Sequence, residues 1–143
     1  IAAQNYLAAY LNVRQLSFGL TDMAWHTLTE PFEGDVEQFE AVSMAPTQVL
    51  PVVSGTAMAP AFGHIFSGGY AAGYYGYKWA EVLEADAFSL FKEKGIFNRE
   101  VSGSFRENIL SKGGTEHPME LYVRFRGHKP ETKALIEKMG LGK

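Results

Sequence analysis

The chain has 143 residues, of which 46% are hydrophobic and 20% are charged, and its net charge is −3 at pH 7. This length supports a hydrophobic core, and this composition is that of a globular rather than a disordered protein. The negative charge argues against phosphate-backbone binding, so we expect no nucleic-acid partner. The absence of cysteine excludes a disulfide scaffold, a thiol nucleophile and any cysteine-ligated metal.

The apolar stretches predict no membrane partner, because glycine, serine or a charge interrupts each one well short of the span of a bilayer. Residues 1–10 lack the basic stretch and the cleavage site of a signal peptide, so we expect a cytoplasmic protein. The chain starts at Ile1, inside a helical pattern. That start indicates the remainder of a longer chain, although a trimmed tag or a processed terminus would look the same.

The first two expected elements are helices. One runs from about the N-terminus to Leu28, because apolar residues recur at steps of three and four on one face. These residues are Val13, Leu16, Leu20 and Met23. Asp35 and Gln38 then form a capping box that opens a second helix, which Pro46 ends. Residues 47–60 are rich in proline and glycine and predict a loop.

The longest helix is expected to begin near Phe66 or Ser67 and to continue to Lys94, where Gly95 stops it. A capping box at Ser104 and Glu107 predicts a short helix that ends at residues 113–114.

Two prolines well placed for a first helical turn predict the last helices, at residues 118–127 and 130–140. No segment alternates as a strand would. The chain is therefore expected to be all-α, with about six helices and one long central helix.

Tyr70, Tyr74 and Tyr77 stand out on the long helix, where spacings of four and three place them on one face. Their hydroxyls are neutral donors that suit a peptide carbonyl or a developing oxyanion. The alternative is ordinary packing, with the rings in the core and the hydroxyls at its edge. Tyr75 points elsewhere and is expected to pack. A neighbouring face of small residues would let another helix approach closely: Gly69, Gly73, Gly76 and Ala80.

His64 precedes the Gly68–Gly69 pair and can reach the same space as the tyrosines, where it would donate a hydrogen bond to substrate. The alternative is a solvated structural histidine. Glycines before a helix also occur in phosphate-binding loops, but the lysine and serine or threonine of such loops are missing. Ser67 resembles a nucleophile turn, yet no base is expected beside it.

No metal site is complete in this sequence. The four histidines are His26, His64, His117 and His128, and none lies four residues from another, so the His-Glu-x-x-His arrangement is absent. The His26–Glu30 pair is more typical of an exposed helix contact. We expect ordinary surface or interhelical charges at the carboxylates Glu81, Glu84 and Asp86.

The run from Phe62 to Phe88, FGHIFSGGYAAGYYGYKWAEVLEADAF, resembles the C-terminal part of the thimet-oligopeptidase family, of the bacterial oligopeptidase A and peptidyl-dipeptidase type. The resemblance covers most of the chain. Upstream it extends over residues 14–26, and downstream it continues through residues 95–100, 105–111, 113–116, 118–121, 124–127 and 140–141.

The resemblance implies a mostly helical zinc metallopeptidase that cleaves short peptides in a deep channel. In the family, a His-Glu-x-x-His helix and a glutamate on the next helix hold zinc, and all of them lie upstream of this segment. Residues 1–143 then form one all-helical piece of a larger catalytic domain. Zinc is implied in the full-length parent and none is expected in this chain.

Carried over position by position, the resemblance assigns a catalytic role to Tyr77, which matches the phenol that helps to stabilise the tetrahedral oxyanion. The matched substrate-binding positions are His64, Gly68, Gly69, Tyr70 and Tyr74, with the two glycines in a flexible loop that closes on the peptide backbone.

The sequence thus predicts the substrate-binding and oxyanion-stabilising part of a zinc-dependent oligopeptidase that hydrolyses short peptides. Alone it is expected to be inactive, with short peptides and the rest of the peptidase chain as its partners. A non-catalytic helical peptide-binding module and a purely structural helical domain are the alternatives.

Overall fold

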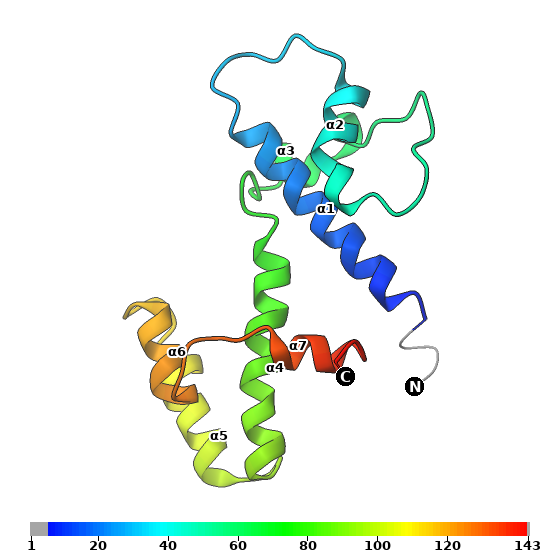
Figure 1. Cartoon of the computed structure of the whole chain (residues 1–143). Helices are drawn as coiled ribbons and strands as arrows, with labels where there is room; N and C mark the ends of the chain where they lie inside the picture. Colours follow the sequence, from blue (N-terminus) through cyan, green and yellow to red (C-terminus); the bar gives the residue numbers. More distant parts are fainter. Residues whose placement is uncertain (1–5, 143) are drawn as a thin grey trace. The chain divides into compact units, whose positions relative to one another are not determined.

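The computed structural model describes residues 6–142, which form seven α-helices and contain no strand, so the all-α prediction is confirmed (Figure 1). The helices are α1 (Ala8–His26), α2 (Val36–Met44), α3 (Gly63–Phe66), α4 (Gly76–Lys94), α5 (Arg99–Phe105), α6 (Pro118–Arg126) and α7 (Lys133–Lys138). In this described part, no helix has both the length and the apolar character needed to cross a membrane. The chain divides into two compact units, Ile1–Lys78 and Trp79–Lys143, which are described separately.

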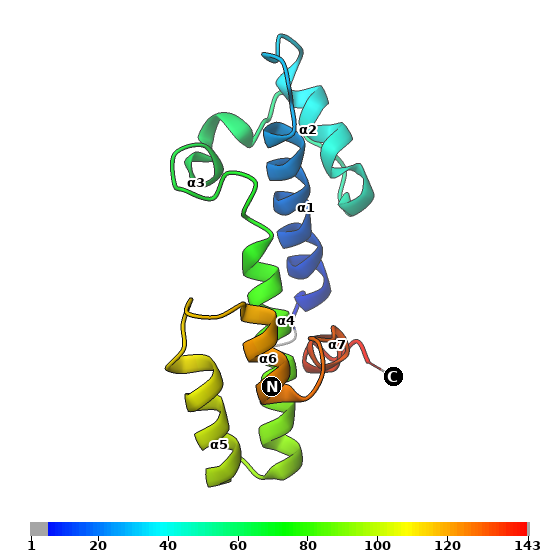
Figure 2. The same cartoon turned by 90° about the vertical axis from the view of Figure 1, so that its left-hand side faces the viewer.

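In the first unit, α1 and α2 lie side by side, as Figures 1 and 2 both show. The predicted capping box that opens α2 is confirmed, because the backbone N–H of Gln38 donates to Oδ1 of Asp35 over 2.9 Å. Trp25 of α1 packs its ring on Phe32 and Phe39, with centroids 5.0 and 4.2 Å away. These aromatic contacts join the two helices.

Helix α1 buries small and polar residues rather than its apolar stripe. Its buried positions are Ser17, Gly19, Thr21 and Asp22. Leu16, Leu20 and Met23 of the predicted apolar face are 46%, 41% and 39% exposed. The buried face is small and polar because it meets main chain: a Cβ on Gly19 would lie 3.8 Å from Cα of Tyr75.

The prediction that the long helix starts near Phe66 is wrong, since α4 begins at Gly76 after a short α3 and a run of turns. Gly69 and Ala72 have φ angles of +80° and +52°, which a right-handed helix cannot contain. The expected helical stripe of small residues, which included Gly69, is therefore wrong as well. The predicted C-terminus is confirmed: α4 ends at Lys94, and Gly95 follows with a φ of +104°.

In the second unit, α4, α5 and α6 enclose an apolar core, and Figure 2 shows α5 beside α4. Its buried members are Ala87, Val101, Tyr122 and Phe125. A second cluster beneath α7 joins Val82 and Ala85 of α4 to Leu135.

Two predicted helix starts in this unit are wrong. Helix α5 begins at Arg99 rather than at the Ser104 box, because the side chain of Asn98 caps it by accepting from the backbone N–H of Glu100 over 2.9 Å. Helix α7 begins at Lys133 rather than Pro130, and its first backbone bond runs from Ile136 N to the carbonyl of Thr132, 3.1 Å.

Helix α6 begins at Pro118 as predicted, and Gly127 with a φ of +87° follows its last residue.

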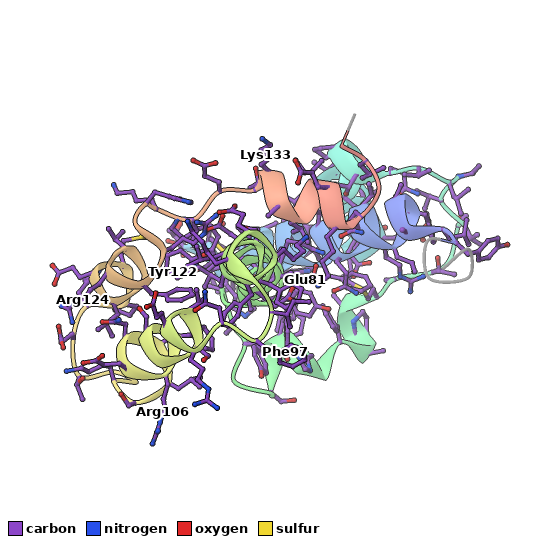
Figure 3. The ribbon with its side chains drawn as sticks, turned by 90° about the horizontal axis from the view of Figure 1, so that it is seen from below. Glu81, Phe97, Arg106, Tyr122, Arg124 and Lys133 are labelled. Carbon is purple, nitrogen blue, oxygen red and sulfur yellow. The ribbon has the colours of Figure 1, made fainter. Side chains whose placement is uncertain are left out.

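Asp86 of α4 is the polar centre of the second unit and is only 3% exposed. The hydroxyl of Tyr122 donates to its Oδ2 over 2.6 Å, and Nε of Arg126 lies 3.7 Å from its Oδ1. Figure 3 shows Tyr122 directed between α6 and α4. Burial, followed by the hydrogen bond to Asp86, raises the pKa of Tyr122 far above its ordinary range. The expected interhelical charges are thus found for Asp86 and for Glu84, which pairs with Lys138 at 2.6 Å.

Replacing Tyr122 by phenylalanine is expected to lower the free energy of unfolding by about 1–3 kcal/mol, because the buried carboxylate of Asp86 loses a donor. Urea denaturation measures this change. Tyr75→Phe is the matched control: that side chain is 59% exposed, so its loss of a hydroxyl is expected to cost under about 0.5 kcal/mol. Equal losses in the two variants would contradict the role given to the Asp86–Tyr122 bond.

Candidate functional site

Four of the residues singled out in the sequence form one aromatic cluster in the first unit, here called the tyrosine cluster: His64, Tyr70, Tyr74 and Tyr77. The ring of His64 stacks on Tyr70 at 4.5 Å and 5°. Tyr77 lies 5.1 Å from Tyr70 and 5.3 Å from Tyr74, measured between centroids. The residues come from three places: α3, the loop of residues 67–75 and the first turn of α4.

A polar contact within the cluster joins Nε2 of His64 to the hydroxyl oxygen of Tyr77 over 3.0 Å. In the tautomer with a proton on Nε2, His64 donates to the phenol oxygen, so the phenol proton points away from the imidazole. Both side chains are accessible, and Tyr77 is 42% exposed. A ligand can therefore reach the Tyr77 hydroxyl.

The pKa of Tyr77 is raised above its ordinary value of 10.0 by a hydrogen bond with Tyr70, then by burial and by the neighbouring phenols of Tyr70 and Tyr74. A raised pKa keeps the phenol protonated at neutral pH, so Tyr77 remains a hydrogen-bond donor there.

Tyr74 connects the cluster to α1. Its hydroxyl donates to Oε1 of Gln15 over 2.9 Å, and its ring meets Phe18 edge-on at 5.8 Å. The side chain is half-buried, and burial raises its pKa. Since its proton is already donated to Gln15, Tyr74 offers a ligand its ring and the lone pairs of its oxygen.

Gly68 and Gly69 shape the loop that carries Tyr70. A Cβ on Gly68 would lie 2.7 Å from the carbonyl oxygen of His64, closer than such atoms approach. Gly69 has a φ of +80°, which favours glycine. The geometry thus explains why both positions are glycine, and their contact with a peptide backbone stays a prediction.

Asp22 of α1 is a site residue that the sequence reasoning missed. It is fully buried, and its two carboxylate oxygens accept the backbone N–H groups of Ala72 and Tyr74 over 2.9 and 2.8 Å. Nδ1 of His26 lies 2.8 Å from Oδ1 of the same carboxylate. The sequence suggested a contact between His26 and Glu30, four residues later. In the structure His26 contacts Asp22, four residues earlier. The available sequence signal was that Asp22 lies near the small residues Ser17, Gly19 and Thr21 on α1.

The hydroxyl of Ser67 is bonded within its own turn. It donates to the carbonyl of Gly63 over 2.9 Å, and this contact holds it against its own short helix. No base is expected beside it in the sequence.

The tyrosine cluster does not fit a zinc ion. It contains one histidine and no carboxylate, whereas protein zinc sites use three or four histidine, cysteine or carboxylate ligands. Within residues 6–142, no three such side chains are grouped so that they could hold a metal. The arrangement instead offers neutral donors and aromatic faces, which suit the carbonyl groups and side chains of an organic ligand.

A family model described as peptidase family M3 matches residues 1–141. The chain belongs to peptidase family M3. Oligopeptidase A of Escherichia coli (strain K12) is 50% identical to it over 142 residues, which are 99% of this chain and 21% of that protein. The probable cytosolic oligopeptidase A of Arabidopsis thaliana is 42% identical over 147 residues, again 99% of this chain and 21% of the relative.

A dipeptidyl carboxypeptidase of Escherichia coli (strain K12) is 41% identical over 128 residues, 88% of this chain and 19% of that protein. The family resemblance seen in the sequence is thereby confirmed. The M3 chain spans about a fifth of the length of the curated relatives it matches.

Tyr77 is expected to ionise above pH 10.0, the ordinary tyrosine value, because its pKa is raised. The difference between ultraviolet pH titrations of the unchanged chain and of Tyr77→Phe isolates this phenol. Since the folded-state pKa lies above the unfolded one, its contribution to stability is present below pH 10.0 and is lost as the pH rises through the folded value. A midpoint at or below 10.0 would show that the Tyr70 contact does not hold the proton on Tyr77.

Proposed function

We propose that this M3 chain is the substrate-binding and oxyanion-stabilising part of a zinc-dependent oligopeptidase that hydrolyses short peptides. The observation that carries the proposal is the accessible His64–Tyr77 pair, 3.0 Å apart inside an aromatic cluster. Family membership and the names of the relatives, oligopeptidase A and dipeptidyl carboxypeptidase, support peptides as the substrate class.

In this proposal Tyr77 acts on the carbonyl oxygen of the peptide bond that is cleaved. Negative charge develops on that oxygen as the carbon becomes tetrahedral, and a preorganised neutral O–H donor stabilises it. His64 supports this role by donating to the phenol oxygen, which directs the phenol proton away from the imidazole. Because the pKa of Tyr77 is raised, the donor is present throughout the neutral range.

The remaining members of the cluster hold the peptide. Tyr70 is 38% exposed and presents a hydroxyl and a ring edge, while Tyr74 supplies a ring that is fixed through Gln15. Gly68 and Gly69 have no side chains, so a substrate backbone can approach the loop closely.

Zinc belongs, in this proposal, to the part of the parent protein outside these 143 residues. When bound there, it supplies the activated water that attacks the peptide. This chain contributes binding, orientation and a proton donor at the Tyr77 hydroxyl, and its partners are short peptides and the rest of the peptidase. A cytoplasmic location is part of the proposal, and it is supported by the Arabidopsis relative named as cytosolic.

Tyr77→Phe in the full-length peptidase is expected to lower kcat by about 10²–10³-fold with little change in KM, because the lost donor acts mainly in the transition state. Steady-state kinetics on a short peptide measure both constants. Tyr75→Phe, the exposed neighbour, serves as the control and is expected to keep full activity. If Tyr77→Phe kept full kcat, or lost stability in proportion to activity, the oxyanion role would be wrong.

The 143-residue chain alone is expected to bind no stoichiometric zinc and to cleave no peptide, because its described residues offer no metal-binding group. Equilibrium dialysis against zinc and a fluorogenic peptide assay test the two points. The same assay on the full-length gene product is the positive control. Zinc-dependent cleavage by the pure chain would refute the proposal that the zinc site lies outside these 143 residues.

A further inference from the structure

We propose that Asp22 and His26 of α1 are positioning residues that fix the loop of residues 67–75 for peptide binding. The proposal rests on the function proposed above and deepens it, because it assigns the peptide-holding geometry to a pair of residues outside the tyrosine cluster. Neither side chain is required to touch the substrate. Their action is exerted through the backbone of Ala72 and Tyr74.

The contact is a fork of two backbone bonds to one carboxylate. Oδ1 of Asp22 accepts from Ala72 N over 2.9 Å and Oδ2 accepts from Tyr74 N over 2.8 Å. Asp22 is 0% exposed, so no water competes for these bonds. Hydrogen bonds to a charged acceptor are the strong class, and a buried pair of them defines both the distance and the orientation of the loop.

His26 supplies a third contact to the carboxylate, at the oxygen that also accepts from Ala72 N. Its Nδ1 lies 2.8 Å from Oδ1 of Asp22 and 2.8 Å from the main-chain oxygen of the same residue. Both neighbours are acceptors, so Nδ1 carries the proton and donates. The Asp22 carboxylate thus receives three N–H groups, and the imidazole holds it in the rotamer that reaches the loop.

The carboxylate of Asp22 holds an unfavourable backbone conformation at Ala72. Ala72 has a φ of +52°, an uncommon conformation for a residue with a side chain. The two amides that flank this turn are those that Asp22 binds. The turn places Tyr70 before it and Tyr74 after it, so loss of the fork would release the two tyrosines that lie on the loop.

Tyr77 depends on Asp22 less directly, because it lies in the first turn of α4 and its N–H donates to the carbonyl of Tyr74 over 3.2 Å. The structure therefore separates two roles within one cluster. Loosening the loop should weaken the grip on the peptide, which raises KM, whereas removing the Tyr77 hydroxyl should lower kcat.

The test is Asp22→Asn in the full-length peptidase. The amide keeps one acceptor and turns an NH₂ group toward a backbone N–H, so one bond of the fork is replaced by two facing donors. KM for a short peptide is expected to rise about tenfold, with kcat changed much less. Amide hydrogen exchange at Ala72 and Tyr74 is expected to become about tenfold faster or more.

Glu40→Gln is the matched control. Glu40 of α2 is also a buried carboxylate that accepts two backbone N–H groups, from Met58 and Ala59, but it holds a different loop. A similar loss of stability with an unchanged KM is expected. If the two variants raised KM equally, Asp22 would have only a general folding role, and the proposal would be overturned.

Two substitutions of His26 test the imidazole. His26→Asn keeps an N–H donor near the position of Nδ1 and is expected to retain most of the peptide affinity. His26→Phe removes the donor and is expected to raise KM in the direction of Asp22→Asn. Equal KM values for these two variants would refute the role of the Nδ1 proton.

The two readouts separate this inference from the proposed function. Unchanged exchange at Ala72 and Tyr74 in Asp22→Asn would overturn the positioning role and leave the role of Tyr77 intact. Faster exchange with an unchanged KM would also overturn it, because the loop would then move without affecting the peptide. By contrast, a full kcat in Tyr77→Phe would contradict the proposed oxyanion role of Tyr77.

Discussion

The loop that carries Tyr70 and Tyr74 depends on one buried carboxylate, that of Asp22. Asp22 lies one turn before the end of α1 with no exposed surface, and it is compensated by two backbone N–H groups from the loop and by His26. A buried carboxylate without such partners would be strongly destabilising, so α1 and the loop must keep this geometry together. The same bonds explain why α1 can bury Asp22, and they hold the non-helical backbone at Ala72 and Tyr74 between α3 and α4.

Helix boundaries could be predicted from sequence where a local side-chain or backbone signal decides them. Asp35 caps α2, Pro118 opens α6, and Gly95 stops α4 with a left-handed backbone. Each signal acts within a few residues of the helix end, so the local sequence is enough to predict that end. Ser104 failed as a cap because Asn98 starts the helix six residues earlier and leaves Ser104 inside it.

The stretch before Gly76 could not be predicted in this way, because a distant residue decides its conformation. Spacings of four and three placed the three tyrosines on one helix face, and they do gather in space, but two of them lie on a loop. The bond between Asp22 and Tyr74 spans 52 positions in the sequence. No periodicity reports a contact of that kind, so the spacing grouped the tyrosines without revealing the loop or Asp22.

The Tyr77 hydroxyl is the proposed donor to the oxyanion, and the most direct test is a structure of the full-length peptidase with a phosphinic peptide bound. The tetrahedral phosphinate oxygen of such a ligand stands for the oxyanion of the reacting peptide bond. The Tyr77 hydroxyl is expected to lie within about 3 Å of that oxygen, the distance of a hydrogen bond. A phosphinate bound away from Tyr77, with the tyrosine cluster facing solvent or other protein, would contradict it.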